Sequence, residues 1–369
     1  MKFAFVIHPT SLEDVVRYEP GAVGKGRPII EKIMEWMPAY AAVHVTGVRT
    51  PDGRETEGWF VAANYMPEQL LGLPRETVYR KILDAIEIGA KLGAEIVGLG
   101  AFTGVVGDAG VTLASRSPIP VTTGNSLTIA AGMASLLRGA REMDVELAGA
   151  TAVVIGATGS IGSACVELLA PHVAEVVLVA RNRTRLENLE AQLRERVACK
   201  LSIETDVRAA VPRAQLVLTA TTSTQELIEP EDLRTGAVVC ELSLPHDVGR
   251  RVALERPDVL VTEGGNVRVP GTPRFGRVRE PGRDFDLGLP PQTALACMSE
   301  TMILALENRR ANYTLGRGID LEKVREIEAL ATGAGFELAG MRAFDAEITP
   351  LKIAEIKAAA RERRAVAAR

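Results

Sequence analysis

A glycine-rich turn in the middle of the chain constrains the fold more than any other feature of the sequence. Segment 151–168, TAVVIGATGSIGSACVEL, joins a buried-strand pattern to three glycines and then to an amphipathic helical pattern. Small residues allow a tight turn and a close approach to a pyrophosphate, and the helix that follows offers unpaired N–H groups. Because another strand pattern follows at Glu175 to Ala180, the segment predicts a Rossmann-type dinucleotide site. The predicted cofactor-binding residues of the turn are Gly156, Ala157, Thr158, Gly159, Ser160, Ile161 and Gly162.

The residues after the second strand indicate which dinucleotide binds. A carboxylate at this strand end would hold the ribose 2′-hydroxyl of NAD(H), whereas arginine accommodates a 2′-phosphate. The sequence here is ARNRTRL, without a carboxylate at the strand end, and guanidinium groups match phosphate geometry with paired donors. The pattern therefore favours NADPH, with Arg181, Asn182 and Arg183 as binding residues, while the solvated start of a helix is the alternative explanation.

Length and hydrophobic content predict more than one domain. A chain of 369 residues with 47% hydrophobic residues can bury two cores. We predict an α/β fold in which a Rossmann-type doubly wound sheet, residues 144–267, is inserted in, or follows, a mixed α/β catalytic domain, residues 1–143. Residues 268–369 are expected to form a connection and C-terminal helices that carry Cys297 and pack back on the catalytic domain.

Composition argues against several classes of protein. The formal charge of −4 argues against general nucleic-acid binding, and the longest apolar runs are shorter than the ~20 residues of a transmembrane helix. Four cysteines without C-x-x-C spacing, and a start without a cleavable signal pattern, predict a reduced, cytoplasmic protein. The zinc pattern H-E-x-x-H is absent, and no tyrosine precedes a lysine by four residues as in short-chain dehydrogenases. Semialdehyde dehydrogenases have a histidine after their nucleophile, whereas His8, His44, His172 and His246 all precede Cys297.

Two further segments bear on the site. Ligands bind at the carboxyl ends of parallel strands, so strand-end residues are expected on the nicotinamide side, although ordinary loops are equally compatible with the pattern. These residues are Thr221, Thr222, Ser223 and Leu244. The Pro/Gly-rich segment 269–291 predicts a long, mobile connection, and a strong helical pattern covers residues 292–308.

Cys297, near the start of that predicted helix, is the candidate nucleophile. A thiolate there could attack a thioester carbonyl and hold the acyl group for hydride delivery. From spacing alone, a cysteine packed as a small hydrophobe is the commoner case, and the sequence shows no basic partner for the thiol. The candidates for oxyanion stabilisation are the segment 100–103, Asn125 and Gln292.

Several separate blocks make the chain similar to the long-chain acyl-(acyl carrier protein) reductases of cyanobacteria, from about residue 4 to 340. The blocks are HPTSLE at 8–13, LGAFT at 99–103, TTGN at 122–125, VVIGATGSIGSA at 153–164, ARNRTRLENLE at 180–190, ALACMSETM at 294–302 and NYTLGRG at 312–318. The resemblance implies NADPH-dependent reduction of a fatty acyl thioester, on acyl carrier protein or coenzyme A, to a fatty aldehyde through a cysteine acyl-enzyme. Cys297 stands at that cysteine's position, and an aldehyde-consuming enzyme is an expected downstream partner.

The chain departs from the family pattern in two places. SLPHD at 243–247 replaces a glycine-containing turn, and the C-terminal tail is basic. The tail's cations are Lys352, Lys357, Arg361, Arg363, Arg364 and Arg369. They are compatible either with docking of an acidic carrier protein or with a solvated terminal helix. Two other functions stay open: an NADP-dependent dehydrogenase of the shikimate or amino-acid dehydrogenase type, which would rely on a lysine and aspartate pair, and a noncatalytic NADP(H)-binding scaffold.

Overall fold

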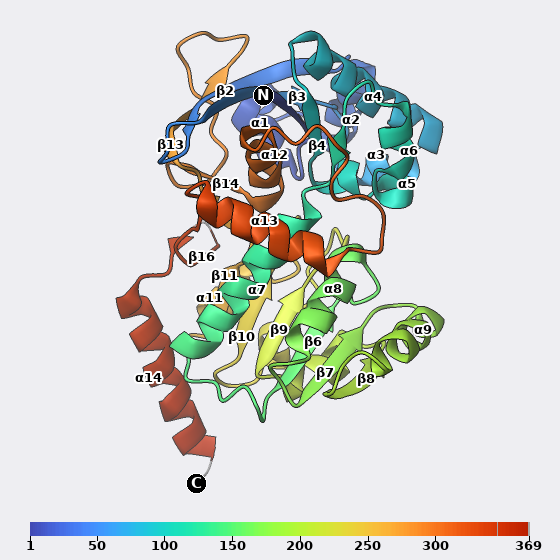
Figure 1. Ribbon diagram of the computed structural model, residues 1–369. Helices are drawn as coiled ribbons and strands as arrows, with labels where there is room; N and C mark the ends of the chain where they lie inside the picture. Colours follow the sequence, from blue (N-terminus) through green and yellow to red (C-terminus); the bar gives the residue numbers. More distant parts are fainter. Residues whose placement is uncertain (345, 368–369) are drawn as a thin grey trace. The chain divides into compact units, whose positions relative to one another are not determined.

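The computed structural model describes residues 1–344 and 346–367, which divide into two compact units (Figure 1). Unit 1 comprises Met1–Leu127 and Val267–Glu337, and unit 2 comprises Thr128–Asn266 and Leu338–Arg369. Arg369, one of the predicted basic tail residues, lies outside the described residues. The domain boundaries suggested by the sequence, at residues 143 and 267, remain a prediction.

Unit 1 is built on a six-stranded mixed sheet. In sheet order its strands are β13 (Gly271–Arg277), β2 (Tyr40–Arg49), β3 (Glu55–Ala62), β1 (Phe3–Ile7), β4 (Ile96–Leu99) and β5 (Val121–Thr122). β1 pairs in parallel with both β3 and β4, while β2 runs antiparallel to β3. Its helices are α1 (Leu12–Tyr18), α2 (Arg27–Trp36), α3 (Pro67–Gly72), α4 (Arg75–Lys91), α5 (Val106–Ala109), α6 (Val111–Arg116), α12 (Ala296–Leu306) and α13 (Leu321–Gly333), with 3₁₀ helices η1 (Pro20–Ala22) and η2 (Ala101–Gly104).

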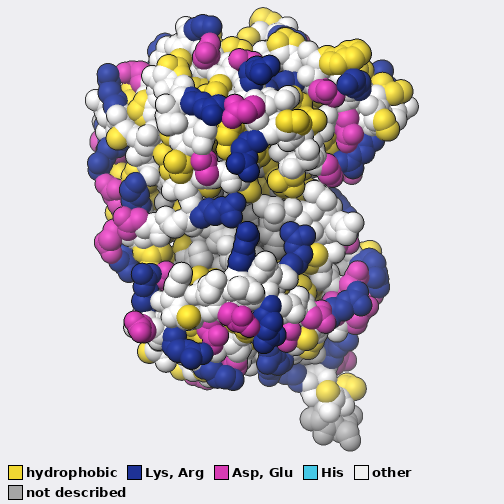
Figure 2. Space-filling model, turned by 90° about the vertical axis from the view of Figure 1, so that its right-hand side faces the viewer, with side chains coloured by type: hydrophobic (Ala, Val, Ile, Leu, Met, Phe, Trp, Pro, Cys, Tyr) yellow, Lys and Arg dark blue, Asp and Glu magenta, His cyan; other side chains and the backbone are white. Residues whose placement is uncertain are grey.

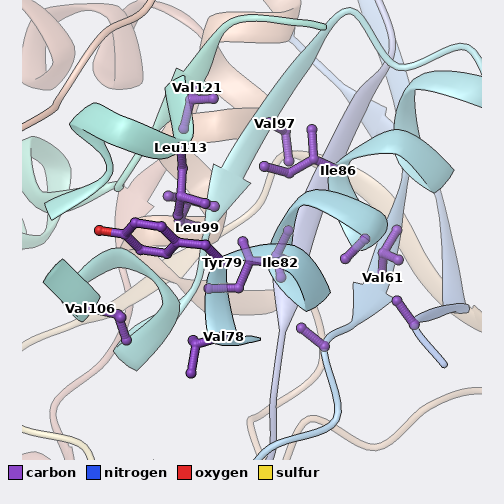
Figure 3. Packing of buried hydrophobic residues seen from close by; sticks show 14 of the residues in the cluster. Val61, Val78, Tyr79, Ile82, Ile86, Val97, Leu99, Val106, Leu113 and Val121 are labelled. Atoms are coloured by element: carbon purple, nitrogen blue, oxygen red, sulfur yellow. The ribbon is translucent and has the colours of Figure 1, made fainter. Parts of the chain in front are cut away.

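Helices α4 and α12 bury opposite faces of this sheet. Successive side chains of a strand point to opposite sides, so Ala4 and Val6 of β1 join the apolar cluster against α4. Figure 3 shows side chains of that cluster around Leu99. On the other face, a Cβ on Gly98 would meet both Phe5 and the Thr301 hydroxyl of α12. The N-terminal end of α12 is thereby fixed close to the carboxyl ends of the central strands.

Unit 2 contains a six-stranded, entirely parallel sheet. In sheet order its strands are β11 (Leu260–Glu263), β10 (Val238–Glu241), β9 (Leu216–Thr219), β6 (Thr151–Ile155), β7 (Glu175–Val179) and β8 (Lys200–Glu204). Its helices are α8 (Ser160–Leu169), α9 (Arg183–Arg194), α10 (Val207–Ala210), α11 (Arg250–Glu255), α14 (Pro350–Ala367) and most of α7 (Asn125–Glu142), with 3₁₀ helices η3 (Val211–Arg213) and η4 (Pro230–Asp232). This strand order and the helical crossovers are those of a Rossmann-type doubly wound sheet, so the predicted fold class is confirmed.

Five short strands complete the described structure. They are β14 (Thr293–Leu295), β12 (Asn266–Arg268) and β15 (Glu337–Leu338) in one sheet, and β16 (Arg342–Ala343) and β17 (Ala346–Glu347) in another.

The prediction of a long mobile connection over residues 269–291 is wrong for its first part. β13 pairs antiparallel with β2, and Phe275 lies opposite Val45. The Phe275 ring is buried 5.8 Å from the ring of Phe60, which gives the strand an apolar anchor. Phe275 is the single buried aromatic of this strand, and a proline and glycines surround it. The alternating pattern of apolar and polar residues that identifies a strand is therefore not recognisable in the sequence of this short edge strand.

The helix predicted over 292–308 begins later than expected. Thr293–Leu295 form β14, and α12 starts at Ala296. Gln292 has a φ of 59°, a left-handed conformation incompatible with a helix, and lies in the turn directly before β14. Cys297 is consequently the second residue of its helix.

Candidate active site

The predicted glycine turn of unit 2 follows β6 and leads directly into α8. Gly156 has a φ of 85°, and a Cβ there would lie 2.3 Å from the Ala220 carbonyl oxygen. A Cβ on Gly162 would lie 2.3 Å from the carbonyl oxygen of Gly156, so both positions exclude side chains. Gly159 is the N-cap of α8 and gives it no side-chain cap. The first N–H groups of α8 therefore lie beside a tight turn at the carboxyl end of β6, an arrangement that fits a pyrophosphate.

The turn residues differ in their access to solvent. Ala157 and Gly162 are buried beneath the turn, so they shape it but offer no accessible side chain to a ligand. The other turn residues, Gly156, Thr158, Gly159, Ser160 and Ile161, are at least partly exposed. These are the residues whose main-chain and hydroxyl groups a dinucleotide could reach.

The arginines lie at the carboxyl end of β7, next to the glycine turn in the sheet. Arg181 is exposed and has no hydrogen-bond or ion-pair partner among residues 1–344 and 346–367. The Asn182 side chain caps α9 by accepting from the Arg185 N–H at 3.0 Å. Arg183 is paired with Glu187 at 3.0 Å. Of the three, Arg181 is best placed to take up a phosphate, and Asn182 already serves its own helix.

Thr221 and Thr222 follow β9, also at the carboxyl edge of the unit 2 sheet. The Thr221 hydroxyl donates to Asp247 at 2.7 Å, and its N–H donates to the Ser243 hydroxyl at 2.8 Å. Burial raises the pKa of Asp247, which also accepts from Ser243. Thr221 is therefore tied into an internal network, while Thr222 is exposed.

In unit 1, Cys297 lies against the TTGN segment. Gly124 has a φ of 75°, and a Cβ there would stand 2.4 Å from both the Cα and the Cβ of Cys297. No residue other than glycine can approach the thiol so closely without displacing it. The Cys297 side chain is a free thiol that remains partly accessible to solvent.

Main-chain amides lie near the Cys297 sulfur. The N–H groups of Met298, Cys297 and Ala101 each act to lower its pKa. Ala101 begins η2 and has a φ of 44°, which is unusual for a residue with a side chain. Burial outweighs these amides and raises the pKa of Cys297 to about 12, so the resting thiol keeps its proton at neutral pH. The same amides can stabilise negative charge that develops during a reaction at the sulfur.

Glu300, one helical turn after Cys297, is a site residue that the sequence analysis missed. Its carboxyl group is fully buried and accepts hydrogen bonds from the Thr122 hydroxyl, from the Thr314 hydroxyl at 3.0 Å and from the Leu127 N–H at 2.9 Å. Burial raises the pKa of Glu300, and its charge acts to raise that of Cys297. The spacing C-x-x-E on one helix face was the only hint of this role in the sequence.

Thr314 connects another sequence block to the same pocket. Its carbonyl oxygen accepts from the Thr123 N–H at 2.9 Å, and its hydroxyl lies 2.8 Å from that of Ser126. Three of the blocks identified in the sequence, TTGN, ALACMSETM and NYTLGRG, thus meet around Glu300 and Cys297. LGAFT joins them through the Ala101 amide.

The two other predicted catalytic side chains have different positions. Asn125 begins α7 and directly follows Gly124, which contacts Cys297. Gln292 is exposed, and its Nε2 lies 3.5 Å from the Gly271 carbonyl oxygen on β13. The part of Asn125 and Gln292 in oxyanion stabilisation stays a prediction. Asn125 is linked to Cys297 through its neighbour Gly124, whereas no such contact within the described residues links Gln292 to the thiol.

Metal-binding clusters and membrane-spanning helices are two features that would indicate other classes of protein. Within residues 1–344 and 346–367, no group of His, Cys, Asp or Glu side chains has the arrangement of a metal site. In the same residues, no helix has the length and apolar character needed to span a membrane.

Part of unit 2 is similar to a known family of dehydrogenases. Residues 139–261 match the family described as shikimate / quinate 5-dehydrogenase. A solved structure of L-alanine dehydrogenase is 18% identical, covering 42% of this chain and 52% of that chain, with a TM-score of 0.29.

Comparison with individual proteins extends over more of the chain. The aminotransferase PigE of a Serratia species is 30% identical over 97% of this chain, which spans only 42% of that protein's length. The long-chain acyl-[acyl-carrier-protein] reductase of Synechococcus elongatus is 28% identical over 79% of this chain and 85% of its own length. A glutamyl-tRNA reductase of Corynebacterium glutamicum is 29% identical over 35% of this chain and 30% of its own. With the Rossmann-type sheet, these similarities support a nicotinamide-dependent oxidoreductase.

Proposed function

We propose that this chain reduces long-chain fatty acyl thioesters to fatty aldehydes with NADPH, through an acyl-enzyme on Cys297. The observation that carries the proposal is the set of groups around Cys297, where main-chain amides lie near the sulfur and Gly124 packs directly against the Cα and Cβ of the cysteine. The similarity to the Synechococcus reductase, over 79% of this chain, supports the same class of substrate. The proposed substrates are thioesters of acyl carrier protein or of coenzyme A.

Each group in the pocket has a defined part in the proposed reaction. The Cys297 sulfur forms a bond to the thioester carbonyl carbon as the bond to the carrier's sulfur breaks, and the carrier leaves as a thiol with the Cys297 proton. The Ala101 and Met298 amides, which lie near the sulfur, stabilise the negative charge that develops on the sulfur and on the adjacent carbonyl oxygen. When bound, NADPH supplies the hydride for the acyl carbonyl. The bond from sulfur to carbon then breaks, the aldehyde leaves, and Cys297 regains a proton from solvent.

The glycine turn of unit 2 fits a dinucleotide without rearrangement. A Cβ on Gly156 or Gly162 would clash with backbone atoms of the turn and its neighbour Ala220, so both glycines are needed for the tight turn that leads into the uncapped start of α8. We assign the 2′-phosphate to Arg181 and Arg183 and the nicotinamide side to Thr222. The preference for NADPH over NADH is part of the proposal, because this preference depends on the two arginines.

Intact-protein mass spectrometry tests the covalent step. The protein is incubated with a palmitoyl thioester in the absence of NADPH, and we expect one acyl addition that maps to Cys297 and disappears in Cys297→Ala. Cys199→Ser is the matched control, because Cys199 is the other partly exposed cysteine and should not affect labelling. Aldehyde formation by Cys297→Ser at the wild-type rate, or turnover without any acyl adduct, would rule out the proposed mechanism.

The match of residues 139–261 favours a second candidate, a shikimate or amino-acid dehydrogenase-like oxidoreductase. Such an enzyme would rely on a lysine and aspartate pair. Lys81, a buried lysine of unit 1, donates instead to the carbonyl oxygens of Met34 and Glu35 at 2.9 and 2.8 Å. Turnover of a hydroxy acid by Cys297→Ala would support this candidate, and nucleotide binding without any turnover would support a noncatalytic scaffold.

The proposed protein partners are an acyl carrier protein and an aldehyde-consuming enzyme. The basic tail is less available for docking than its sequence suggests, because Lys357 pairs with Asp144 at 2.7 Å and Arg363 with Asp258 at 3.2 Å, all within unit 2. Figure 2 shows Lys and Arg side chains interspersed with Asp and Glu on the face that it draws. The basic tail by itself therefore does not carry the assignment of a carrier protein.

A further inference from the structure

His8, the first residue after β1, has both ring nitrogens engaged. Its Nδ1 lies 2.9 Å from the carbonyl oxygen of Pro9, and its Nε2 accepts a hydrogen bond from the Phe102 N–H at 3.0 Å. A carbonyl oxygen can only accept, so Nδ1 carries the hydrogen, and an N–H can only donate, so Nε2 carries the lone pair. The two contacts together specify one neutral tautomer of His8.

The surroundings of His8 keep it in this neutral form. Its ring packs edge-on against the Phe102 ring, with 5.9 Å between centroids. Burial lowers the pKa of His8 to about 4, against smaller opposing effects of the Pro9 carbonyl and of Asp14 on α1. Asp14 is itself engaged by the Thr10 N–H at 2.9 Å. At neutral pH the ring therefore remains an acceptor for Phe102.

The Phe102 amide lies one residue from the amide that faces the thiol. Ala101 has a φ of 44°, a left-handed conformation that is unfavourable for a residue with a Cβ. The bond from the Phe102 N–H to His8 restrains the peptide that directly follows Ala101. Thr103 adds a second restraint, because its hydroxyl donates to the Gly100 carbonyl oxygen at 2.7 Å.

We propose that His8 is a positioning residue for Cys297: its Nε2 accepts from the Phe102 N–H and so holds the Ala101–Phe102 segment, which keeps the Ala101 N–H near the sulfur, where it stabilises negative charge. His8 touches neither thioester nor cofactor in this role. The inference rests on the proposed function for its use in thioester reduction. Its effect on the thiol itself can be measured without any turnover.

Two substitutions separate the acceptor from the rest of the side chain. In His8→Gln the amide oxygen can reach the place of Nε2 and accept from Phe102, whereas in His8→Asn the shorter side chain reaches only the place of Nδ1. The readout is the rate of iodoacetamide alkylation of Cys297 at pH 8, resolved by peptide mass spectrometry in a Cys199→Ser background. We expect His8→Asn to slow alkylation roughly tenfold, which is one unit of thiol pKa, and His8→Gln to remain within about twofold of the parent.

The same variants should show a characteristic kinetic split with a palmitoyl thioester. His8→Asn should lower kcat roughly tenfold with little change in KM, because the Ala101 amide acts on charge that develops during the reaction. If alkylation depends on His8 but no thioester reacts, the proposed function fails and the positioning role stands. If thioesters react but His8→Asn alkylates at the parental rate, the positioning role fails alone.

A measurement on the unmodified ring covers the case in which His8→Asn does not fold. Long-range ¹H–¹⁵N correlation of histidine-labelled protein at pH 7 reports which ring nitrogen of His8 carries the hydrogen. We expect the Nδ1–H tautomer. Observation of the Nε2–H tautomer would overturn the proposal. So would a folded His8→Gln protein in which alkylation of Cys297 is slowed roughly tenfold, as is expected only of His8→Asn.

Discussion

At the scale of single residues, opposing effects set the state of the Cys297 thiol. Three amides favour the thiolate, while burial and the nearby Glu300 carboxylate oppose it, and burial is the largest effect. A thiol that is protonated at rest is protected from adventitious oxidation and alkylation, because the thiolate is the reactive form. The proposed reaction then requires that the thiol proton leave as the substrate carbonyl approaches the sulfur.

Gly124→Ala should disrupt this pocket. The added Cβ would stand 2.4 Å from the Cβ of Cys297 at a φ of 75°, so we expect the free energy of unfolding to fall by about 3 kcal/mol and acylation of Cys297 to be lost. Urea unfolding and acyl labelling measure the two effects. Gly333→Ala is the control, since a Cβ there meets nothing within 4 Å and should change neither. A Gly124→Ala protein with wild-type stability and labelling would contradict the packing described.

Arg181→Ala should change cofactor preference. The substitution removes an exposed guanidinium at the end of β7, so we expect the Kd for NADPH to rise roughly tenfold while that for NADH is unchanged. Fluorescence titration with the two nucleotides measures both constants. Arg194→Ala, at the other end of α9 and paired with Glu190, is the control. An equal loss for both nucleotides would argue against recognition of a 2′-phosphate.

At the scale of helices and strands, Glu300 joins α12 to the start of α7. Its carboxylate accepts from the Leu127 N–H of α7, from the hydroxyl of Thr122 at the end of β5 and from the Thr314 hydroxyl, so it takes the place of a cap for a helix on another part of the chain. The TTGN loop that carries Gly124 is held between the two helices by these bonds. The orientation of the pocket around Cys297 depends on this junction.

Glu300→Gln should loosen the junction. The amide must direct its NH₂ group either at the Leu127 N–H or at the Thr122 and Thr314 hydroxyls, which would then have to turn from donors into acceptors, so we expect a loss of about 2 kcal/mol in the free energy of unfolding. Removal of the negative charge should also lower the pKa of Cys297 and speed its alkylation at pH 8. Glu307→Gln, near the exposed end of the same helix and paired with Arg54, should change either quantity little. Slower alkylation in a folded Glu300→Gln protein would contradict the electrostatic part of this prediction.

The elements differ in how far the sequence predicts them. The glycine turn is local, so a strand, three glycines and a helix within residues 151–168 are sufficient to identify it. β13 is not local, because its stability comes from pairing with β2 and from the contact of Phe275 with Phe60. The pocket around Cys297 is even less local: the roles of His8 and Glu300 depend on contacts across long sequence separations, which periodicity cannot report.

At the scale of the whole molecule, His8 links the pocket to acid stability. Its pKa is lowered from 6.5 to about 4 in the folded chain, so the unfolded chain binds the proton first as the pH falls. The free energy of unfolding should therefore fall by about 2 kcal/mol between pH 6.5 and 4, after allowance for the partial exposure of the ring. Above pH 6.5 this contribution is complete and no longer changes.

Chemical unfolding of the wild type and His8→Gln at a series of pH values measures this contribution. The variant lacks the titrating ring, so the difference between the two curves isolates His8 from the carboxylates. We expect the wild type to lose stability relative to His8→Gln on acidification. A difference that is constant between pH 7 and 4 would show that the ring is not held neutral.

The chain passes from unit 1 to unit 2 and returns before Cys297 is reached, so the thiol and Gly124 belong to distant stretches of sequence in one unit. Pro281 and Gly282 lie in an exposed turn that separates these stretches. A gene divided there would encode one fragment with Ala101, Gly124 and the glycine turn, and a second with Cys297. Neither fragment would contain a complete thiol pocket, and acylation would appear only when the two associate. The divided protein would be a fragment-complementation reporter, in which acylation of Cys297 reports the association of the two fragments.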